Sequence, residues 1–400
     1  MKLTSESPYW LLKNGLTESC PSLDHDLDCE VLVVGGGITG ALITDRLTEE
    51  GYHVTVVDRR DICSGSTSAS TALLQYEIDV SLTEMRELIG EEKANRAYQV
   101  SHGSIDRLEQ IARSLEADVC FERRTSIYLA TDRKSALELA NEARARKAIG
   151  LDVQYHNDQE LLEKFRLEGT AALSSEQAAA CDPYKFAAKL HERSKSRGAT
   201  FYDKTEVGNY QFIDGICKLE TPDGNEIKAK HVIYANGFES SSMLKERIVN
   251  LDNTYALVSE PLKDTYPWDE RWMMWEAKEP YLYLRITSDG RLLVGGEDDE
   301  HHSPSRRDKL ITRKSAIIEK KVRELLPDLR WKKDHEWAGT FGKTRDGLAY
   351  IGKSEEYPGA LFALCFGGNG ITFSAIAADM MVDFLRTGDS PNSDIFAFGR

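Results

Sequence analysis

The sequence feature that most constrains the fold is a glycine motif between two apolar segments near the start of the chain. An apolar run within residues 28–34 leads into Gly35, Gly37 and Gly40, spaced as Gly-x-Gly-x-x-Gly, and a second apolar run ends at Asp58. Glycines in this pattern permit a tight turn, the close approach of a pyrophosphate to the backbone, and close helix packing. An acid about 20 residues further on is suited to hold a ribose hydroxyl. The pattern therefore predicts a strand–turn–helix–strand unit that binds a dinucleotide, either FAD or NAD(P).

Length and charge narrow the possible organisation and partners. The 400 residues exceed what one hydrophobic core usually supports, so we expect two domains. The formal net charge of −15 disfavours nucleic acid or an anionic membrane surface as a main partner. No apolar run reaches the roughly 18 residues of a membrane-spanning helix. The seven cysteines and nine histidines show no spacing typical of disulfides or metal ligands. With no apparent secretory signal, these features predict a cytoplasmic protein without a bound metal.

Hydrophobic periodicity and turn residues divide the rest of the chain into two kinds of structure. Helices are expected over 81–117, 133–149, 183–197, 308–325 and 370–385. Short strands, several of them separated by Asp-Gly turns, are expected over 201–207, 216–220, 226–234, 253–260, 272–277, 281–287 and 291–296. We therefore expect a Rossmann-like α/β domain that is discontinuous in sequence, and an α+β substrate domain with an antiparallel sheet. The expected ranges are 28–80, 165–245 and 335–386 for the first domain, and 81–164 and 246–334 for the second.

Three further features favour FAD over NAD(P). A loop of small residues, 64–72, follows the second strand; a later strand ends at Ala235-Asn-Gly237; and a second glycine turn, residues 367–370, opens the last helix. The amide groups and dipole of a helix start can stabilise negative charge on a reduced flavin. The expected cofactor is therefore FAD.

The segments that carry these motifs resemble the FAD-dependent oxidoreductases of the D-amino-acid oxidase superfamily. The resemblance spans about residues 28–386 and includes Asp182-Pro183, residues 289–296 and residues 337–347. Trp337 and the N-terminal Ser7-Pro-Tyr-Trp10 look most like the gamma-glutamylputrescine oxidoreductase branch. The resemblance implies an enzyme that oxidises a C–N bond of a small amine. In such enzymes a hydride passes from the carbon beside the nitrogen to flavin N5, and O2 usually reoxidises the flavin.

The motifs and the resemblance together assign the residues expected to bind FAD. We expect the pyrophosphate at residues 35–40, the adenosine ribose at Asp58, the central part of the cofactor at 66–71, the flavin edge at 367–372, and the adenine at the Val207 backbone. The full set is Gly35, Gly37, Ile38, Thr39, Gly40, Asp58, Arg59, Ser66, Thr67, Ser68, Ala69, Ser70, Thr71, Val207, Ala235, Gly237, Asp346, Gly368, Asn369, Gly370, Ile371 and Thr372. The cysteine that links flavin covalently in sarcosine oxidases falls near Gly339, so we expect FAD to bind non-covalently.

The positions that hold a substrate carboxylate in related amino-acid oxidases carry other residues in this chain. They correspond to Phe341, Ala72, Gln75 and Thr372, which disfavours glycine, sarcosine and D-amino acids as substrates. Strand alternation places Tyr281, Tyr283 and Arg285 on one face, either as an aromatic wall with a cationic end or as a half-buried sheet surface. No catalytic residue is identified, and the candidate pocket residues are Gln75, Tyr281, Tyr283, Arg285, Trp337, Phe341 and Asn369.

Three alternatives to an amine oxidase remain open from the sequence. The same fold could serve a dehydrogenase that passes electrons to a quinone or a protein instead of O2. The glycine motif alone is also compatible with NAD(P), and a flavoprotein could act as a non-catalytic redox sensor. The substrate, the electron acceptor and the oligomeric state are not determined by the sequence.

Overall fold

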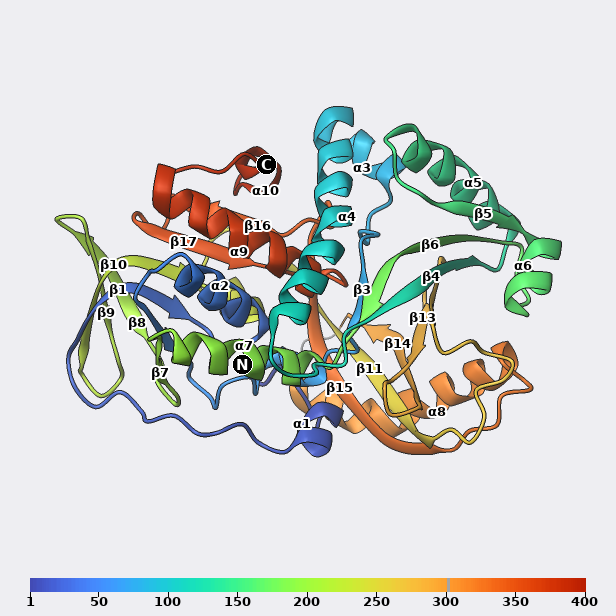
Figure 1. Ribbon diagram of the computed structural model, residues 1–400, viewed down its shortest axis with the longest axis horizontal. Helices are drawn as coiled ribbons and strands as arrows, with labels where there is room; N and C mark the ends of the chain where they lie inside the picture. Colours follow the sequence, from blue (N-terminus) through green and yellow to red (C-terminus); the bar gives the residue numbers. More distant parts are fainter. Residues whose placement is uncertain (301–302) are drawn as a thin grey trace.

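The computed structural model describes residues 1–300 and 303–400, and the strands within these ranges form two sheets in two lobes (Figure 1). The first sheet has the order β16-β17-β10-β1-β2-β7, and the hairpin β8–β9 joins it at β10. Strands β17, β10, β1, β2 and β7 run parallel. The bounds are β1 Leu27–Val34, β2 Val54–Val57, β7 Thr200–Tyr202, β8 Gly208–Ile213, β9 Ile216–Glu220, β10 Glu226–Tyr234, β16 Tyr350–Lys353 and β17 Ala360–Leu364.

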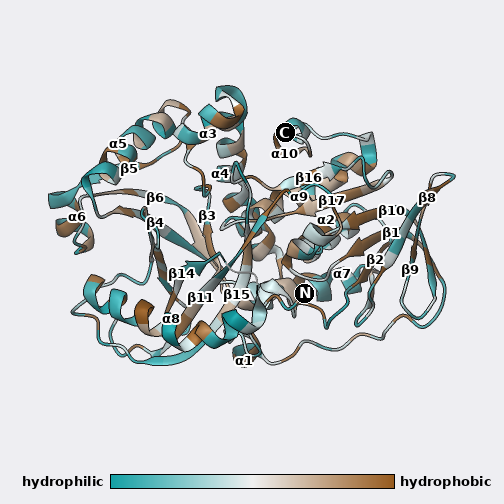
Figure 2. Cartoon of the chain, turned by 180° about the vertical axis from the view of Figure 1, so that it is seen from behind, coloured by the Kyte–Doolittle hydropathy of each residue, from teal (hydrophilic) through white to brown (hydrophobic). Residues whose placement is uncertain are grey.

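Three helices, α2 (Ile38–Glu49), α7 (Pro183–Ser196) and α9 (Gly370–Thr387), pack beside this parallel sheet. All four residues of β2 are buried, and β1, β2 and β10 carry many of the hydrophobic residues of this lobe (Figure 2). Helix α7 begins where its sequence predicts, because Asp182 accepts the Lys185 amide and Pro183 occupies the first turn. This lobe is the predicted Rossmann-like domain.

The second sheet has nine strands in the described ranges, with the order β15-β11-β14-β13-β12-β4-β6-β3 and β5 paired to β6. Its neighbours are antiparallel except for β12 and β4. The bounds are β3 Leu73–Gln75, β4 Glu122–Ala130, β5 Gln154–Asn157, β6 Ala171–Ala180, β11 Asn250–Pro261, β12 Trp272–Glu276, β13 Leu282–Ile286, β14 Arg291–Asp299 and β15 Lys333–Lys343. The predicted antiparallel sheet of an α+β domain is therefore confirmed, with one parallel pair.

Helices cover this second sheet and join it to the first lobe. Helix α8 (Pro304–Leu325) packs on β11, β14 and β15, and α5 (Arg133–Ala148) packs on β4, β5 and β6. The helix predicted over 81–117 is two helices, α3 (Leu82–Ile89) and α4 (Glu91–Ser114), since Gly90 between them has φ +86°. Helix α4 also contacts α9 of the other lobe. The remaining short elements are α1 Tyr9–Asn14, α6 Asp158–Phe165, α10 Ser393–Phe396 and the 3-10 turns η1 Ser66–Ala69 and η2 Gly237–Ser242.

Strand pairing differs from the expected domain ranges at three strands. Strands β3, β6 and β15 lie in the nine-stranded sheet, although the expected ranges group their residues with the Rossmann-like domain. These pairings join residues far apart in sequence, which local periodicity does not encode. Residues 73–75, 171–180 and 333–343 therefore pair within the nine-stranded sheet, while the domain boundaries themselves stay a prediction.

The residues before β1 lie against both lobes. Thr4 forms a β-bridge with Gly339 of β15, and the buried Trp10 of α1 donates from Nε1 to the Ser70 carbonyl at 2.6 Å. The segment thus fixes the small-residue loop that follows β2 against the second sheet. Within the described ranges, no helix is long and apolar enough to cross a bilayer.

Candidate FAD-binding and substrate site

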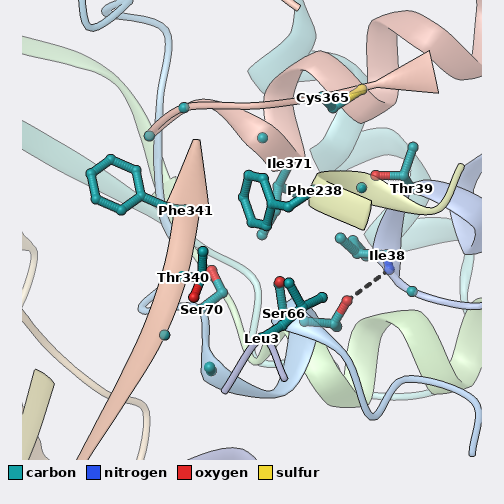
Figure 3. A pocket seen from close by; sticks show the side chains of 18 of the residues that line it. Leu3, Ile38, Thr39, Ser66, Ser70, Phe238, Thr340, Phe341, Cys365 and Ile371 are labelled. Carbon is teal, nitrogen blue, oxygen red and sulfur yellow. Dashed lines mark hydrogen bonds between the residues drawn. The ribbon is translucent and has the colours of Figure 1, made fainter. Parts of the chain in front are cut away.

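A cavity of about 640 Å³ is lined by residues from both sheets. Its walls come from the turn after β1, the loop after β2, the ends of β10 and β17, the start of α9, and strands of the second sheet. Figure 3 shows Ile38 and Thr39 on one side of it, Phe341 of β15 on the other, and Cys365 and Ile371 near the start of α9. The cavity therefore lies where the dinucleotide motif meets the substrate domain.

The glycine turn after β1 has the close packing that its sequence predicts. A Cβ on Gly35, whose φ is +115°, would lie 2.5 Å from the Ala235 carbonyl oxygen, and a Cβ on Gly40 would lie 1.9 Å from the Gly35 oxygen. The Ile38 amide at the start of α2 donates to Thr67 Oγ1 at 2.9 Å (Figure 3). The turn is thus held against both β10 and the following loop, with its backbone open to the cavity.

Asp58 lies at the end of β2 and lines the same cavity. Its two carboxylate oxygens accept the backbone amides of Gly36 and Arg60, each at 2.8 Å. Burial raises the pKa of Asp58, and these two amide hydrogen bonds oppose the shift. The following Arg59 pairs with Glu239 and also lines the cavity. This arrangement leaves a carboxylate beside the glycine turn, where a ribose is expected.

Two indole groups fix the loop of residues 66–71. Trp337 of β15 donates from Nε1 to the Ala69 carbonyl at 2.9 Å, and Trp10 donates to Ser70. Trp337 also stacks on Tyr9, with ring centroids 5.9 Å apart. The N-terminal segment was not assigned to the cofactor domain from sequence, and Leu3 lies at the cavity wall (Figure 3). The aromatic residues of this segment suggest that it packs against the rest of the protein, but only the tertiary structure shows which loop they contact.

The second glycine turn connects β17 to α9 at the other end of the cavity. The Gly367 amide donates to the Gly342 carbonyl, and the Gly368 amide donates to Asp79 Oδ2, each at 2.8 Å. Asn369 lies behind this wall, where its Nδ2 donates to the carbonyls of Gln75 and Glu77 at 3.0 and 2.9 Å. The turn therefore ties the start of α9 to β3 and the segment after it.

Most residues assigned from sequence line the cavity. Those that do are Gly35, Gly37, Ile38, Thr39, Asp58, Arg59, Ser66, Thr67, Ala69, Ser70, Thr71, Gln75, Val207, Ala235, Gly237, Tyr281, Tyr283, Trp337, Phe341, Gly368, Gly370, Ile371 and Thr372. Gly40, Ser68, Asn369, Asp346 and Arg285 lie outside its lining. Asp346 instead forms an ion pair with Arg400 at 2.7 Å, so its carboxylate contacts the last residue of the chain and not the cavity.

Arg285 corrects one expectation, because its guanidinium is buried in the protein and does not line the cavity. Nε donates to the Thr71 carbonyl at 2.8 Å and Nη2 donates to the Cys181 carbonyl at 2.9 Å. Burial lowers its pKa to about 10, which keeps it charged at neutral pH. The side chain neither reaches solvent nor forms the cationic end of a substrate wall. It instead joins β13 to the loop after β2 and to the end of β6.

We expect Arg285→Ala to destabilise the fold and to leave substrate binding intact. Two buried carbonyls would lose their donors, at a cost of about 1–3 kcal/mol each. Chemical denaturation should show the lower free energy of unfolding, and titration of flavin reduction should give an unchanged KM. Arg271→Ala is the matched control, since Arg271 is 77% exposed and pairs with Asp269. A raised KM with unchanged stability would restore Arg285 as a substrate-binding residue.

Aromatic side chains line the part of the cavity in the substrate domain. Tyr281 donates its hydroxyl to Asp298 at 2.7 Å, and the Tyr283 hydroxyl lies 3.0 Å from Thr254 Oγ1. Tyr283 packs over Gly295, where a Cβ would lie 2.3 Å from its ring. Tyr128 and Trp275, which were not foreseen, stack with centroids 5.3 Å apart and also line the cavity. Of the two alternatives left open by the sequence, an aromatic wall and a half-buried sheet surface, these side chains favour the wall.

Charged residues missed from sequence also line this part of the cavity: Glu77, Asp79, Arg146, Glu276, Glu279 and Lys343. Arg146 is buried and donates from Nε to Glu142 at 2.8 Å. Lys343 lies 3.3 Å from both Asp252 and Glu279. Glu77 and Asp79 are acidic residues within an apolar stretch after β3, and this unusual placement could have identified them as cavity residues. No feature of the sequence near Arg146 indicates that it lines the cavity.

The fold and the cavity together define a flavoprotein-type dinucleotide-binding oxidoreductase. A family model described as "FAD dependent oxidoreductase", DAO, matches residues 30–384. The chain belongs to this family, and its cofactor is FAD. The resemblance found in the sequence is thereby confirmed, and the NAD(P) alternative is set aside.

Individual relatives are distant but cover most of the chain. The "Putative Rieske 2Fe-2S iron-sulfur protein YhfW" of Bacillus subtilis is 25% identical over 98% of this chain and 75% of its own length. The gamma-glutamylputrescine oxidoreductase of Escherichia coli is 22% identical over 94% of this chain and 88% of its own. The glycine oxidase of Geobacillus kaustophilus is 24% identical over 89% of this chain and 93% of its own.

The solved structure of that glycine oxidase shows the same fold. It superposes with a TM-score of 0.77 at 21% identity and covers 94% of this chain and 99% of its own. The residues of the site also suit FAD: the close glycine turn, the carboxylate of Asp58, and a cavity that extends from the first glycine turn to the second. The site and the family therefore agree on the cofactor.

Proposed function

We propose that the protein oxidises a C–N bond of a small amine, with FAD bound non-covalently. The observation that carries the proposal is the continuous cavity that joins the dinucleotide turn to a pocket lined by Tyr281, Tyr283, Tyr128 and Trp275. When bound, FAD supplies the acceptor for a hydride from the carbon beside the amine nitrogen. Relatives named as glycine oxidase and gamma-glutamylputrescine oxidoreductase support this reaction class.

The chain's own residues position the reactants and limit water. We assign the pyrophosphate to the turn of residues 35–40, the ribose to Asp58 and the flavin edge to the turn of residues 367–370. The aromatic residues line the pocket and limit water around the substrate, and the amine reacts there in its neutral form, the form that can release a hydride. Phe341, where amino-acid-oxidising relatives place an arginine, offers no cation for a substrate carboxylate, which supports an amine over a simple amino acid.

Anaerobic reduction of the flavin tests the proposed reaction. Purified protein is mixed without O2 with polyamines, gamma-glutamyl amines, N-methyl amino acids and D-amino acids, and the visible flavin band is followed. We expect one class of amine to bleach the band and the others to leave it unchanged. A flavin that dithionite reduces but no amine bleaches would contradict amine oxidation. Release of the flavin by acid precipitation would show that it is not covalently bound.

The acceptor that reoxidises the reduced flavin is a separate question from the substrate. We favour O2, which would yield peroxide when air is readmitted to the reduced protein. One observation favours another acceptor: a relative that covers 98% of this chain is named as an iron–sulfur protein. Stopped-flow reoxidation compares O2 with a soluble quinone and with a reducible iron–sulfur protein. Reoxidation by O2 slower than turnover, with fast reoxidation by one of the others, would favour a dehydrogenase.

We also propose that the protein is located in the cytoplasm. Free thiols at all seven cysteines suit a reducing compartment, which supports the cytoplasm.

A further inference from the structure

Asp79 projects a carboxylate into the cavity at the junction of the two domains. It follows β3 and lines the cavity between the second glycine turn and the aromatic pocket. Its side chain is exposed to the cavity, and Oδ2 accepts the Gly368 amide at 2.8 Å. Within the described ranges, no lysine or arginine forms an ion pair with it, and Lys343 acts on it only over a longer distance. Among the described residues, the Asp79 carboxylate therefore lines the cavity without a cation in an ion pair with it.

The two cationic side chains that line this part of the cavity, Arg146 and Lys343, are already paired with other carboxylates. Arg146 donates to Glu142, and its Nη1 lies 3.9 Å from Glu77. Lys343 lies 3.3 Å from Asp252 and from Glu279. Neither cation is therefore free to neutralise Asp79. The substrate part of the cavity has a surplus of negative charge, which favours a positively charged ligand.

A second acceptor points to the same kind of ligand. Glu77 lines the cavity, is only 4% exposed, and has an Oε2 atom without a hydrogen-bond partner among the described residues. Its Oε1 accepts the Ser126 hydroxyl at 2.8 Å. A buried carboxylate oxygen without a partner is costly, so a donor is expected to reach it. Glu77 and Asp79 stand two residues apart on the same segment after β3.

Aromatic rings line the same cavity as Asp79. Tyr281 and Tyr283 lie side by side on the cavity wall, with ring centroids 6.2 Å apart. Faces of such rings attract ammonium groups. The combination of an unmatched carboxylate and electron-rich rings is the chemistry that recognises an alkylammonium ion rather than a carboxylate.

We propose that Asp79 is the docking group for the ammonium of a cationic amine substrate and the acceptor of its proton. This rests on the proposed function, because it names the substrate class of the same site. On binding, an N–H bond of the ammonium breaks, the O–H bond of the Asp79 carboxylic acid forms, and the electron pair stays on nitrogen. The neutral amine that results is the form from which a hydride can leave the adjacent carbon.

The electrostatic surroundings support this proton transfer. The protein around the cavity desolvates Asp79 and raises its pKa, although the side chain is open to the cavity; the Gly368 amide and the charge of Lys343 oppose this shift. The negative charge of Asp79 is among the causes that raise the pKa values of Tyr281 and Tyr128. A carboxylate with a raised pKa accepts a proton more readily than one in water.

The test measures binding of an unreactive cation to the FAD-loaded protein. Tetramethylammonium has no nitrogen lone pair, and tert-butanol is a neutral compound of similar size. Perturbation of the visible flavin spectrum gives the Kd of each. We expect the wild type to prefer the cation, and Asp79→Asn to weaken cation binding about 10-fold or more. The asparagine side chain in this variant keeps an oxygen for the Gly368 amide, so the glycine turn is retained.

Two further variants make the result specific. Asp79→Glu keeps the charge and should bind tetramethylammonium more tightly than Asp79→Asn. Glu87→Gln, on the exposed face of α3, removes the same charge away from the cavity and should bind like the wild type. Equal affinity of the wild type and Asp79→Asn for tetramethylammonium would overturn the proposal, as would equal affinity of the wild type for tert-butanol.

Flavin reduction separates this inference from the function on which it rests. If amines bleach the wild type and Asp79→Asn at the same concentrations, amine oxidation stands and the role of Asp79 fails. If the cation preference depends on Asp79 but no amine bleaches the flavin, the cation site stands and amine oxidation fails.

Discussion

Gly40→Ala is expected to yield a protein that binds FAD about 5- to 150-fold more weakly than the wild type. The added Cβ would lie 1.9 Å from the Gly35 carbonyl oxygen, a backbone atom that no side-chain rotation can move away. Relief of this contact requires the turn and the start of α2 to separate. Overpacking of this kind costs about 1–3 kcal/mol or more, and the shift also moves the amides that would hold the pyrophosphate. Each 1.4 kcal/mol lowers affinity about tenfold.

Flavin content and reconstitution of the apoprotein measure this effect. The ratio of visible to ultraviolet absorbance gives the FAD retained on purification, and fluorescence titration of apoprotein gives the Kd. Gly103→Ala is the matched control, since Gly103 lies in α4 and an added Cβ would have nothing within 4 Å of it beyond the helix's own nearby backbone. The control should keep its FAD and gain up to about 1 kcal/mol of stability from helix propensity. A Gly40→Ala variant with wild-type FAD affinity would show that this turn does not carry the pyrophosphate.

Asp58→Asn should weaken FAD binding by about 10- to 150-fold. The two oxygens of Asp58 accept the amides of Gly36 and Arg60, and an asparagine can present only one oxygen. One amide donor would then face the NH2 group, and the charge that suits the ribose hydroxyls would be lost. A hydrogen bond to a charged group contributes about 1.5–3 kcal/mol, which corresponds to this range of affinity.

FMN serves as an internal control for the Asp58 variant, because it lacks the adenosine ribose. Its affinity should change much less than that of FAD. Asp61→Asn, on the same loop, provides a second control; Asp61 pairs with Lys204 at 3.1 Å, and 42% of its side chain is exposed. Equal losses of FMN and FAD affinity in Asp58→Asn would mean that the substitution damages the turn generally and that Asp58 does not bind the ribose.

Some elements of the site follow directly from short stretches of sequence. The strand, turn and helix that contain Gly35 and Gly40 were predicted, and so was the capped start of α7 at Asp182. These features are determined by residues that lie close together in the sequence. Strand alternation placed Tyr281 and Tyr283 on one face of their strand, which is also a local property, and the structure shows that both line the cavity.

Other elements were decided by contacts between distant segments. Arg285 follows the same alternation as Tyr283, yet its guanidinium turns to the Thr71 and Cys181 carbonyls, more than 100 residues away. A buried guanidinium is stable only where such acceptors meet it, and sequence spacing does not show where they lie. Strand β6, likewise, pairs with β3 and β4 rather than with the Rossmann-like sheet.

The sequence by itself predicted the dinucleotide unit with its glycine turn and Asp58, and the small-residue loop and the second glycine turn then favoured FAD and the family. Only the tertiary structure decided the substrate end of the cavity, which is lined by Asp79, Arg146 and Trp275 from three separate segments. The physical reason is the range of the interactions. A turn and its capping groups are fixed by neighbouring residues, whereas the charge balance of a cavity depends on which distant carboxylates and cations the packed sheets bring together.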